Sequence, residues 1–260
     1  MERLASGKRI NSAADDAAGM AVAAKMRADI GSLNQSVRNT NDAISLVNTY
    51  DGAAAEIESI LIRMRELAVQ TRNGTYEEAD RTNANFEYTA LKNEITRIAG
   101  VSAFNRMTVG QGATTANGTT TSADTGFTFY VGSDVAKTGN SITFSAKALD
   151  LNLAVSSGTL NSVVDATSAG QAIATLDDAI TELAANRAQA GALINRLEHT
   201  VSNLMNVSQR LQEAVSGIED ADYAAESANL ARGMVLAQAG TAMLAQANQA
   251  PQYILSLLRG

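Results

Sequence analysis

The chain has 260 residues, with no Cys, no Trp, a single Pro and only 4% aromatic residues. The lack of Cys excludes a disulfide scaffold and a thiolate metal site, and the scarcity of aromatic residues favours slender helices packed through Leu, Ile, Val and Ala over a thick globular core. The net charge of −7, with basic residues scattered along the chain, argues against nucleic-acid binding.

The N-terminal part of the chain has helical periodicity. A heptad track predicts a helix from Ala13 to about Asn48, because apolar residues recur on one face of that stretch. We expect Ser12 to cap this helix, with acidic residues in its first turn, where the helix dipole favours negative charge. The polar residues that mark this start are Asn11, Ser12, Asp15 and Asp16.

Two more helices are predicted before the pattern changes. Asp51-Gly52 is expected to end the first helix, since both residues are typical of turns. A second helix runs to about Asn73-Gly74, with Ile57, Ile60, Met64 and Leu67 on one face. A third runs from about Glu77 to Ala99. Three helices are therefore predicted within residues 13–109.

The middle of the chain is not helical. Residues 110–126 are mostly Gly, Ala, Thr, Ser and Asn and predict an irregular loop. The alternating runs 127–131 and 141–144 predict a β-hairpin. Weaker strand-like pieces lie at 104–109 and 151–155.

One long helix is predicted after the β region. Its apolar stripe repeats every three or four residues, and only Arg187 and Ser208 interrupt it. A stripe of this kind must be covered by other helices. The fold class is therefore mainly α: an elongated antiparallel helical bundle with a small β-hairpin region. The stripe consists of Leu176, Ile180, Leu183, Arg187, Ala190, Ile194, Leu197, Val201, Leu204, Ser208, Leu211, Val215 and Ile218.

The C-terminal stretch Gly233–Leu258 carries no charged residue. Its length suggests a membrane span, but several Gln and Asn side chains would lack partners in lipid. We therefore expect no membrane insertion. The stretch is instead expected to be exposed in the monomer and buried between copies in an assembly.

Four segments resemble bacterial flagellins. They are ERLASGKRINSAADDAAGMAVA (Glu2–Ala23), RMRELAVQ (Arg63–Gln70), the FTFYVGS and SITF strands, and a C-terminal block that begins IEDADYAAESANLAR and continues with LAQAGTAMLAQANQAPQYILSLLR. The segments occur in the family's order and cover nearly the whole chain.

The resemblance implies a structural subunit of the flagellar filament that polymerises through its terminal helices. It implies a rod domain and a coiled-coil inner domain to which the C-terminal helix belongs. The implied parts are a connecting segment (1–12), the N-terminal half of the rod (13–109), a β-hairpin region with short variable loops (110–167), the long rod helix (168–222) and the inner-core helix (223–260). Flagellins normally carry a further segment before the ERL motif that pairs with the C-terminal helix, so we expect no filaments from this chain alone.

The resemblance also implies partners and contact residues. The partners are other flagellin subunits, a flagellar export chaperone, the cap protein and an innate immune receptor of animals, and the location is extracellular, at the flagellum. The implied subunit-contact and receptor patch contains Arg63, Leu67 and Glu94, with Leu67 expected to be exposed. The loop of Asn11, Ser12, Asp15 and Asp16 is expected to contact neighbouring subunits. The assembly residues of the tail are Leu236, Leu244, Ile254 and Leu257.

Two other functions are compatible with parts of the sequence. No enzyme activity and no cofactor are expected, because the single His, His199, has no second His or Cys to share a metal and no phosphate-binding loop occurs. One alternative is a cell-surface adhesin that binds extracellular polysaccharide through Tyr130 and Asn140. The other is a hook–filament junction protein.

Overall fold

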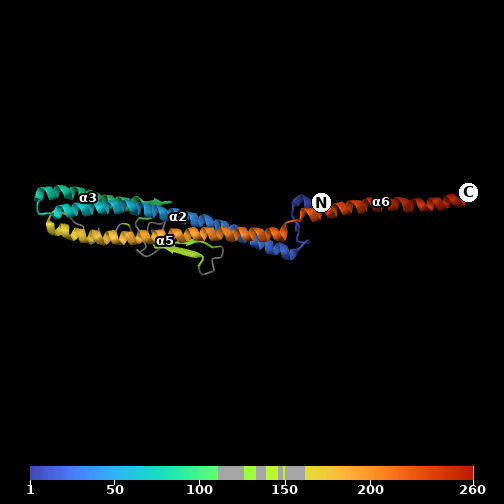
Figure 1. Ribbon diagram of the computed structural model, residues 1–260, viewed down its shortest axis with the longest axis horizontal. Coiled ribbons are helices and arrows are strands. Elements are labelled where there is room, and N and C mark those ends of the chain that lie inside the picture. Colours follow the sequence, from blue (N-terminus) through green and yellow to red (C-terminus); the bar gives the residue numbers. More distant parts are fainter. Residues whose placement is uncertain (111–125, 133–138, 146–148, 150–161, 260) are drawn as a thin grey trace. The chain divides into compact units, whose positions relative to one another are not determined.

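The computed structural model describes residues 1–110, 126–132, 139–145, 149 and 162–259. Its helices are α1 (Glu2–Ser6), α2 (Ala17–Arg72), α3 (Glu78–Val101), α5 (Ala166–Glu219) and α6 (Tyr223–Arg259). Its strands are β1 (Ala103–Phe104), β2 (Met107–Thr108), β3 (Phe127–Tyr130) and β4 (Ser141–Phe144) (Figure 1). The chain divides into two compact units, unit 1 (Met1–Gly31 and Val207–Gly260) and unit 2 (Ser32–Asn206). The predicted mainly α fold is confirmed, whereas the predicted domain boundaries stay predictions.

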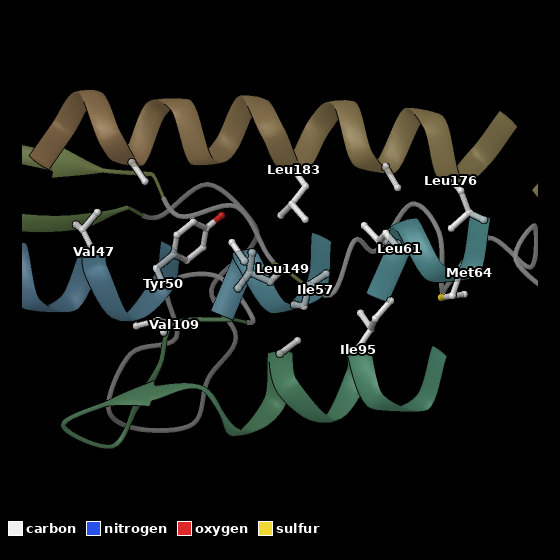
Figure 2. Packing of buried hydrophobic residues seen from close by; sticks show 14 of the residues in the cluster. Val47, Tyr50, Ile57, Leu61, Met64, Ile95, Val109, Leu149, Leu176 and Leu183 are labelled. Atoms are coloured by element: carbon white, nitrogen blue, oxygen red, sulfur yellow. The ribbon is translucent and has the colours of Figure 1, made fainter. Parts of the chain in front are cut away.

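Unit 2 is a bundle in which α2, α3 and α5 bury a common core. Arg65 of α2 contacts Asp177 of α5, while Asp51 contacts Arg187, so α2 and α5 run antiparallel. Figure 2 shows the apolar side chains that fill the space between these helices. Each fully buried Leu or Ile contributes roughly 1.5–3 kcal/mol relative to its exposed state. The core includes Val47, Tyr50, Ile57, Leu61, Met64, Ile95, Leu176 and Leu183.

The predicted stripe lies on a single helix, α5, as expected. Its members in unit 2 are buried or half-buried, and Leu176, Leu183 and Leu197 are completely inaccessible. The helices α2 and α3 provide the cover that the sequence pattern required. The stripe is therefore a core-facing stripe within the subunit.

The expected break at Asp51-Gly52 was wrong, because α2 continues through it to Arg72. A glycine inside a helix costs only about 1 kcal/mol relative to Ala. Tyr50 and Ala54, which flank the dipeptide, are buried in the core, and Asp51 pairs with Arg187. These contacts outweigh the weak local preference for a turn. Residues 13–109 therefore contain two helices, α2 and α3, rather than the predicted three.

The start of α2 also differs from the prediction. The helix begins at Ala17 rather than Ala13, and its cap is Asp16, whose Oδ1 accepts the backbone N–H of Gly19 at 2.8 Å. Ser12 does not cap the helix; its N–H and hydroxyl both donate to Asp15. Either acidic residue can cap, and the local loop geometry selects the second one.

The predicted β-hairpin is confirmed. β3 and β4 pair antiparallel, with Phe127 opposite Phe144 and Tyr130 opposite Ser141. Ile142 and Phe144 are buried, and the ring of Phe144 meets that of Tyr50 edge-on with centroids 5.3 Å apart. The alternating pattern of the hairpin therefore reflects one face packed on the helices.

The weaker strand-like pieces have different outcomes. Residues 103–108 form a second small hairpin, in which β1 and β2 pair antiparallel around Asn105 and Arg106. Both turn residues have positive φ, 48° and 67°, as a tight hairpin turn requires. The predicted piece at 151–155 and most of the predicted loop at 110–126 lie outside the described residues.

Unit 1 contains both ends of the chain. Within it, α5 ends at Glu219 and α6 begins at Tyr223, after a cap in which Asp222 Oδ1 accepts the N–H groups of Ala224 and Ala225. The short helix α1 contacts α6. Across the described residues, no helix combines the length and apolar character needed to cross a membrane.

Candidate subunit-contact surfaces

The helix α6 has little apolar cover within the chain. Leu236 is 65% exposed and Leu244 is 66% exposed. Met234, Val235 and Met243 are exposed as well. Ile254 and Leu257, the other predicted assembly residues, belong to α6, but their side chains lie outside the described part of the chain. The stretch 233–258 of α6 carries no charge, and exposed Leu, Val and Met on such a stretch are typical of a surface that is buried in an assembly.

The predicted contact loop is a compact turn before α2. The Asp15 Oδ2 atom accepts the backbone N–H groups of Asn11 and Ser12 at 3.1 and 2.9 Å. These bonds, above all the one from Ser12, lower the pKa of Asp15. Asp16 caps α2 and lies 3.8 Å from the guanidinium of Arg9. All four predicted loop residues therefore lie together, and the two carboxylates hold the turn in shape.

A second polar cluster, which no local sequence pattern predicts, lies near this loop. Glu219, at the end of α5, pairs with Arg27 of α2 and with Lys8. Its carboxylate is nearly inaccessible to solvent. The partners are separated by about two hundred positions in the chain, so no local motif connects them.

The third candidate surface spans α2 and α3. The guanidinium of Arg63 donates to Glu87 of α3 at 2.9 Å and to Glu66 at 3.1 Å. These hydrogen bonds, the one to Glu87 first, raise the pKa of Arg63. Half of the Arg63 side chain remains exposed. The pair joins the two helices and presents mixed charge on the surface.

Leu67 is the predicted patch residue that the structure contradicts. It is only 2% exposed and belongs to the core of unit 2. Residues three positions apart lie on the same face of a helix. Leu67 therefore shares the buried face of α2 with Met64. Leu67 supports the surface from beneath and is not part of it.

Glu94 is on the surface as expected, and its partner is Arg97. The two side chains share hydrogen bonds of 2.8 and 2.6 Å on α3, which lower the pKa of Glu94. Arg63 and Glu94 thus have separate partners. Phe86 of α3 was not predicted as a surface residue, and it is 69% exposed. Phe86 lies two residues before the buried Tyr88 and therefore on a different face of α3. This spacing could have identified Phe86 as a surface residue.

The surfaces contain charged pairs and exposed apolar side chains. Within the described residues, no group of three His, Asp or Glu side chains is placed to hold a metal ion. Contact with another protein is what these exposed faces are suited to.

Comparisons with known proteins agree over nearly the whole chain. Residues 1–115 match the N-terminal helical region of bacterial flagellin, and residues 173–258 match its C-terminal helical region. The flagellin of Halalkalibacterium halodurans is 43% identical, in an alignment covering 100% of this chain and 90% of the relative. The flagellar filament 33 kDa core protein of Treponema phagedenis is 40% identical, with coverage of 100% and 91%.

Solved structures show the same relationship. The crystal structure of Bacillus cereus flagellin matches with a TM-score of 0.53 and 35% identity, covering 64% of this chain and 88% of that one. A putative flagellar hook-associated protein from Vibrio parahaemolyticus matches with a TM-score of 0.61 over 79% of this chain and 100% of that one, but at 12% identity it shows a shared fold alone. On the two matching regions and the full-length relatives, the chain belongs to the bacterial flagellin family, whose members are structural subunits of the flagellar filament and not enzymes.

Proposed function

We propose that this flagellin polymerises with copies of itself mainly through α6. The observation that carries the proposal is the exposed apolar side chains of a helix whose stretch 233–258 has no charge. Burial of Leu236 and Leu244 would each contribute roughly 1.5–3 kcal/mol, and the absence of charge means that no ion has to lose its water. Ile254 and Leu257 extend the same proposed contact along the helix.

The loop of Asn11, Ser12, Asp15 and Asp16 is the second proposed contact. Its hydrogen bonds to Asp15 hold the loop in one conformation before any partner arrives. A preformed loop loses little conformational entropy on binding. The proposed role of Asp15 is to keep that conformation rather than to touch the neighbouring subunit.

Electron microscopy and sedimentation after a polymerisation trial test the role of α6. The trial is run on the natural protein, with wild-type α6 and with variants of it.

Leu244→Asp places a charge on the exposed apolar surface of α6 and should abolish filaments. Ala225→Asp adds the same charge in the first turn of α6, outside the uncharged stretch, and should leave filaments intact. Filaments formed equally well by both variants would contradict the proposal.

We infer two further partners, and the exposed apolar side chains of α6 support them. We infer that a flagellar export chaperone covers this helix before secretion and that the filament cap protein receives it during assembly. Exposed apolar surface of this kind promotes aggregation unless it is covered. Leu244→Asp should then also weaken co-elution with the chaperone, whereas Ala225→Asp should not.

The surface around Arg63 and Glu94 is the proposed site for an innate immune receptor. Arg63 is half-exposed, and its pairing with Glu87 holds the guanidinium in place on the surface. Arg is enriched among the residues that dominate binding at protein interfaces. Surface plasmon resonance with the receptor ectodomain tests this: Arg63→Ala should weaken binding, Arg196→Ala on α5 should not, and equal binding by wild type and Arg63→Ala would refute the assignment.

Binding of extracellular polysaccharide is a second candidate function, favoured by one cavity. A hollow of about 300 Å³ in unit 2 has Leu33, Val131, Ile142 and Leu204 among its lining residues. Its polar lining residues are Asn140, Arg196, Thr200 and Asn203. Sugar rings offer apolar faces and hydroxyl groups, which suit a lining of this kind.

The other residue predicted for polysaccharide binding, Tyr130, is exposed on β3 and is not among the residues that line the cavity. A glycan array with the wild type and Arg196→Ala tests this function. Binding that is lost in Arg196→Ala but kept in Arg63→Ala supports it, and an array without any bound glycan contradicts it.

A further inference from the structure

Four charged residues of unit 1, Lys8, Arg9, Arg27 and Glu219, form a polar site that we call the Glu219 cluster. Glu219 is the last residue of α5 and is only 4% exposed. Its Oε2 lies 3.3 Å from Nζ of Lys8, and its Oε1 accepts a hydrogen bond from Arg27. A buried carboxylate is tolerated only when opposite charge and hydrogen bonds replace its lost water, and the two cations supply both.

The backbone of the same residues is tied together as well. The N–H of Arg9 donates to the carbonyl of Glu219 at 2.6 Å, and the N–H of Ala221 donates to the carbonyl of Gly7 at 3.0 Å. Lys8 and Asp220 thereby form an isolated antiparallel bridge. The left-handed conformation of Gly7, with φ at 70°, ends α1 and lets the chain turn into this pairing.

The same contacts also stabilise the C-terminal end of α5. The last carbonyl groups of a helix have no partner within the helix. The guanidinium of Arg9 donates to the carbonyl of Ile218 at 2.8 Å, and cations near a helix C-terminus are stabilised by the helix dipole. Side-chain charge, backbone pairing and helix capping therefore all require the same alignment of residues 7–9 with residues 218–221.

We propose that Glu219 is the positioning residue that sets the register between the N-terminal segment and the junction of α5 with α6. Residues 7–9 follow α1 directly, and α1 contacts α6, so a fixed register at Glu219 holds α1 against the start of α6. The consequence for filament assembly rests on the function proposed above. The register itself is a property of the monomer.

Hydrogen exchange of the full-length monomer, read by mass spectrometry, tests the proposal. Glu219→Gln keeps the size of the side chain but removes the charge that Lys8 and Arg27 share. We expect amides in residues 2–11 and 218–225 to exchange about tenfold faster or more, because this part opens without global unfolding. Amides of the unit 2 core, such as those of residues 176–197, should keep their protection.

Glu213→Gln is the matched control, since Glu213 is an exposed Glu on the same helix and accepts a hydrogen bond from the neutral side chain of Gln209. It should leave exchange unchanged throughout. Lys8→Ala and Arg27→Ala should each reproduce part of the effect, and neither should add to it in the Glu219→Gln background.

Unchanged exchange at residues 2–11 in Glu219→Gln would overturn the proposal, and so would equal loss of protection in the core of unit 2, which would make Glu219 a residue of general stability. Because the readout uses the monomer, a failed polymerisation trial counts against the proposed role of α6 and leaves this result standing.

Discussion

The guanidinium of Arg187 on α5 donates to the carboxylate of Asp51 on α2, with Nε 2.9 Å from Oδ1. Arg187 also pairs with Glu58, which lies about two helical turns after Asp51 on α2. Arg187, which interrupts the apolar stripe of α5, is thus paired with Asp51, one of the two residues at which the first predicted helix was expected to end. A charge is unfavourable in the apolar stripe of α5, and Asp51 beside Gly52 is unfavourable within a helix. The ion pair between Arg187 and Asp51 compensates for both at the edge of the core.

Arg187→Ala should therefore destabilise the protein modestly. A third of the side chain is exposed, so water screens the pair, and the expected loss in the free energy of unfolding is about 1 kcal/mol. Chemical denaturation of the single and double variants with Asp51→Ala measures the coupling directly. The more exposed Arg65–Asp177 pair serves as the control and should couple less strongly. Strict additivity at Arg187 and Asp51 would show that the contact contributes nothing.

Leu67 and Arg63 are four residues apart on α2, but truncation of Leu67 should destabilise the protein far more than truncation of Arg63. Leu67→Ala empties a site in the core and should cost about 2–5 kcal/mol of the free energy of unfolding. Arg63→Ala removes an exposed pair and should leave that free energy nearly unchanged. Urea unfolding measures both, and a larger effect of Arg63→Ala than of Leu67→Ala would contradict the structure.

The sequence predicts those parts of the fold whose interacting residues lie close together along the chain, and it misses contacts between residues far apart in the chain. The α5 stripe and the β3–β4 hairpin were predicted correctly because their periodicity is local and strong. Asp51 was assigned to a turn because its partner lies 136 positions away. Glu219 was overlooked for the same reason. Leu67 was assigned to the surface by family resemblance, although its own helical phase with Met64 places it on the buried face.

The start of α5 should become less stable in acid. Asp165 precedes the helix, and its carboxylate accepts the Ser168 hydroxyl at 2.6 Å and the N–H groups of Ser168 and Thr167. These bonds, the one from the Ser168 hydroxyl first, lower the pKa of Asp165. Because the folded-state pKa is lower than that of the unfolded chain, this stabilisation is complete above about pH 4 and is lost as the pH falls through the folded-state value.

Amide exchange of residues 166–170 between pH 5 and pH 2, corrected for the intrinsic rate, measures this loss. Asp165→Asn should keep a capping oxygen while removing the titration, so its protection should depend less on pH. Asp165→Ala should lack protection at every pH. A wild-type profile as flat as that of Asp165→Asn would refute the role of the charge.

Tyr88 offers a case in which removing a polar group should not weaken the fold. Its side chain is 1% exposed in the core, and among the described residues its hydroxyl has no hydrogen-bond partner. Burial accordingly raises the pKa of Tyr88. A buried hydroxyl without a partner costs about 1–3 kcal/mol, so Tyr88→Phe should be neutral or should raise the free energy of unfolding by about 1 kcal/mol.

Tyr88→Ala separates the ring from the hydroxyl. Because the ring fills space between the helices, its loss should cost about 3–5 kcal/mol, as for other large aromatic residues in cores. Thermal and urea unfolding of both variants measure the two contributions. Destabilisation by Tyr88→Phe would mean that the hydroxyl has a partner in solution, with an ordered water the simplest candidate, and the stabilising role would then be shared between ring and hydroxyl.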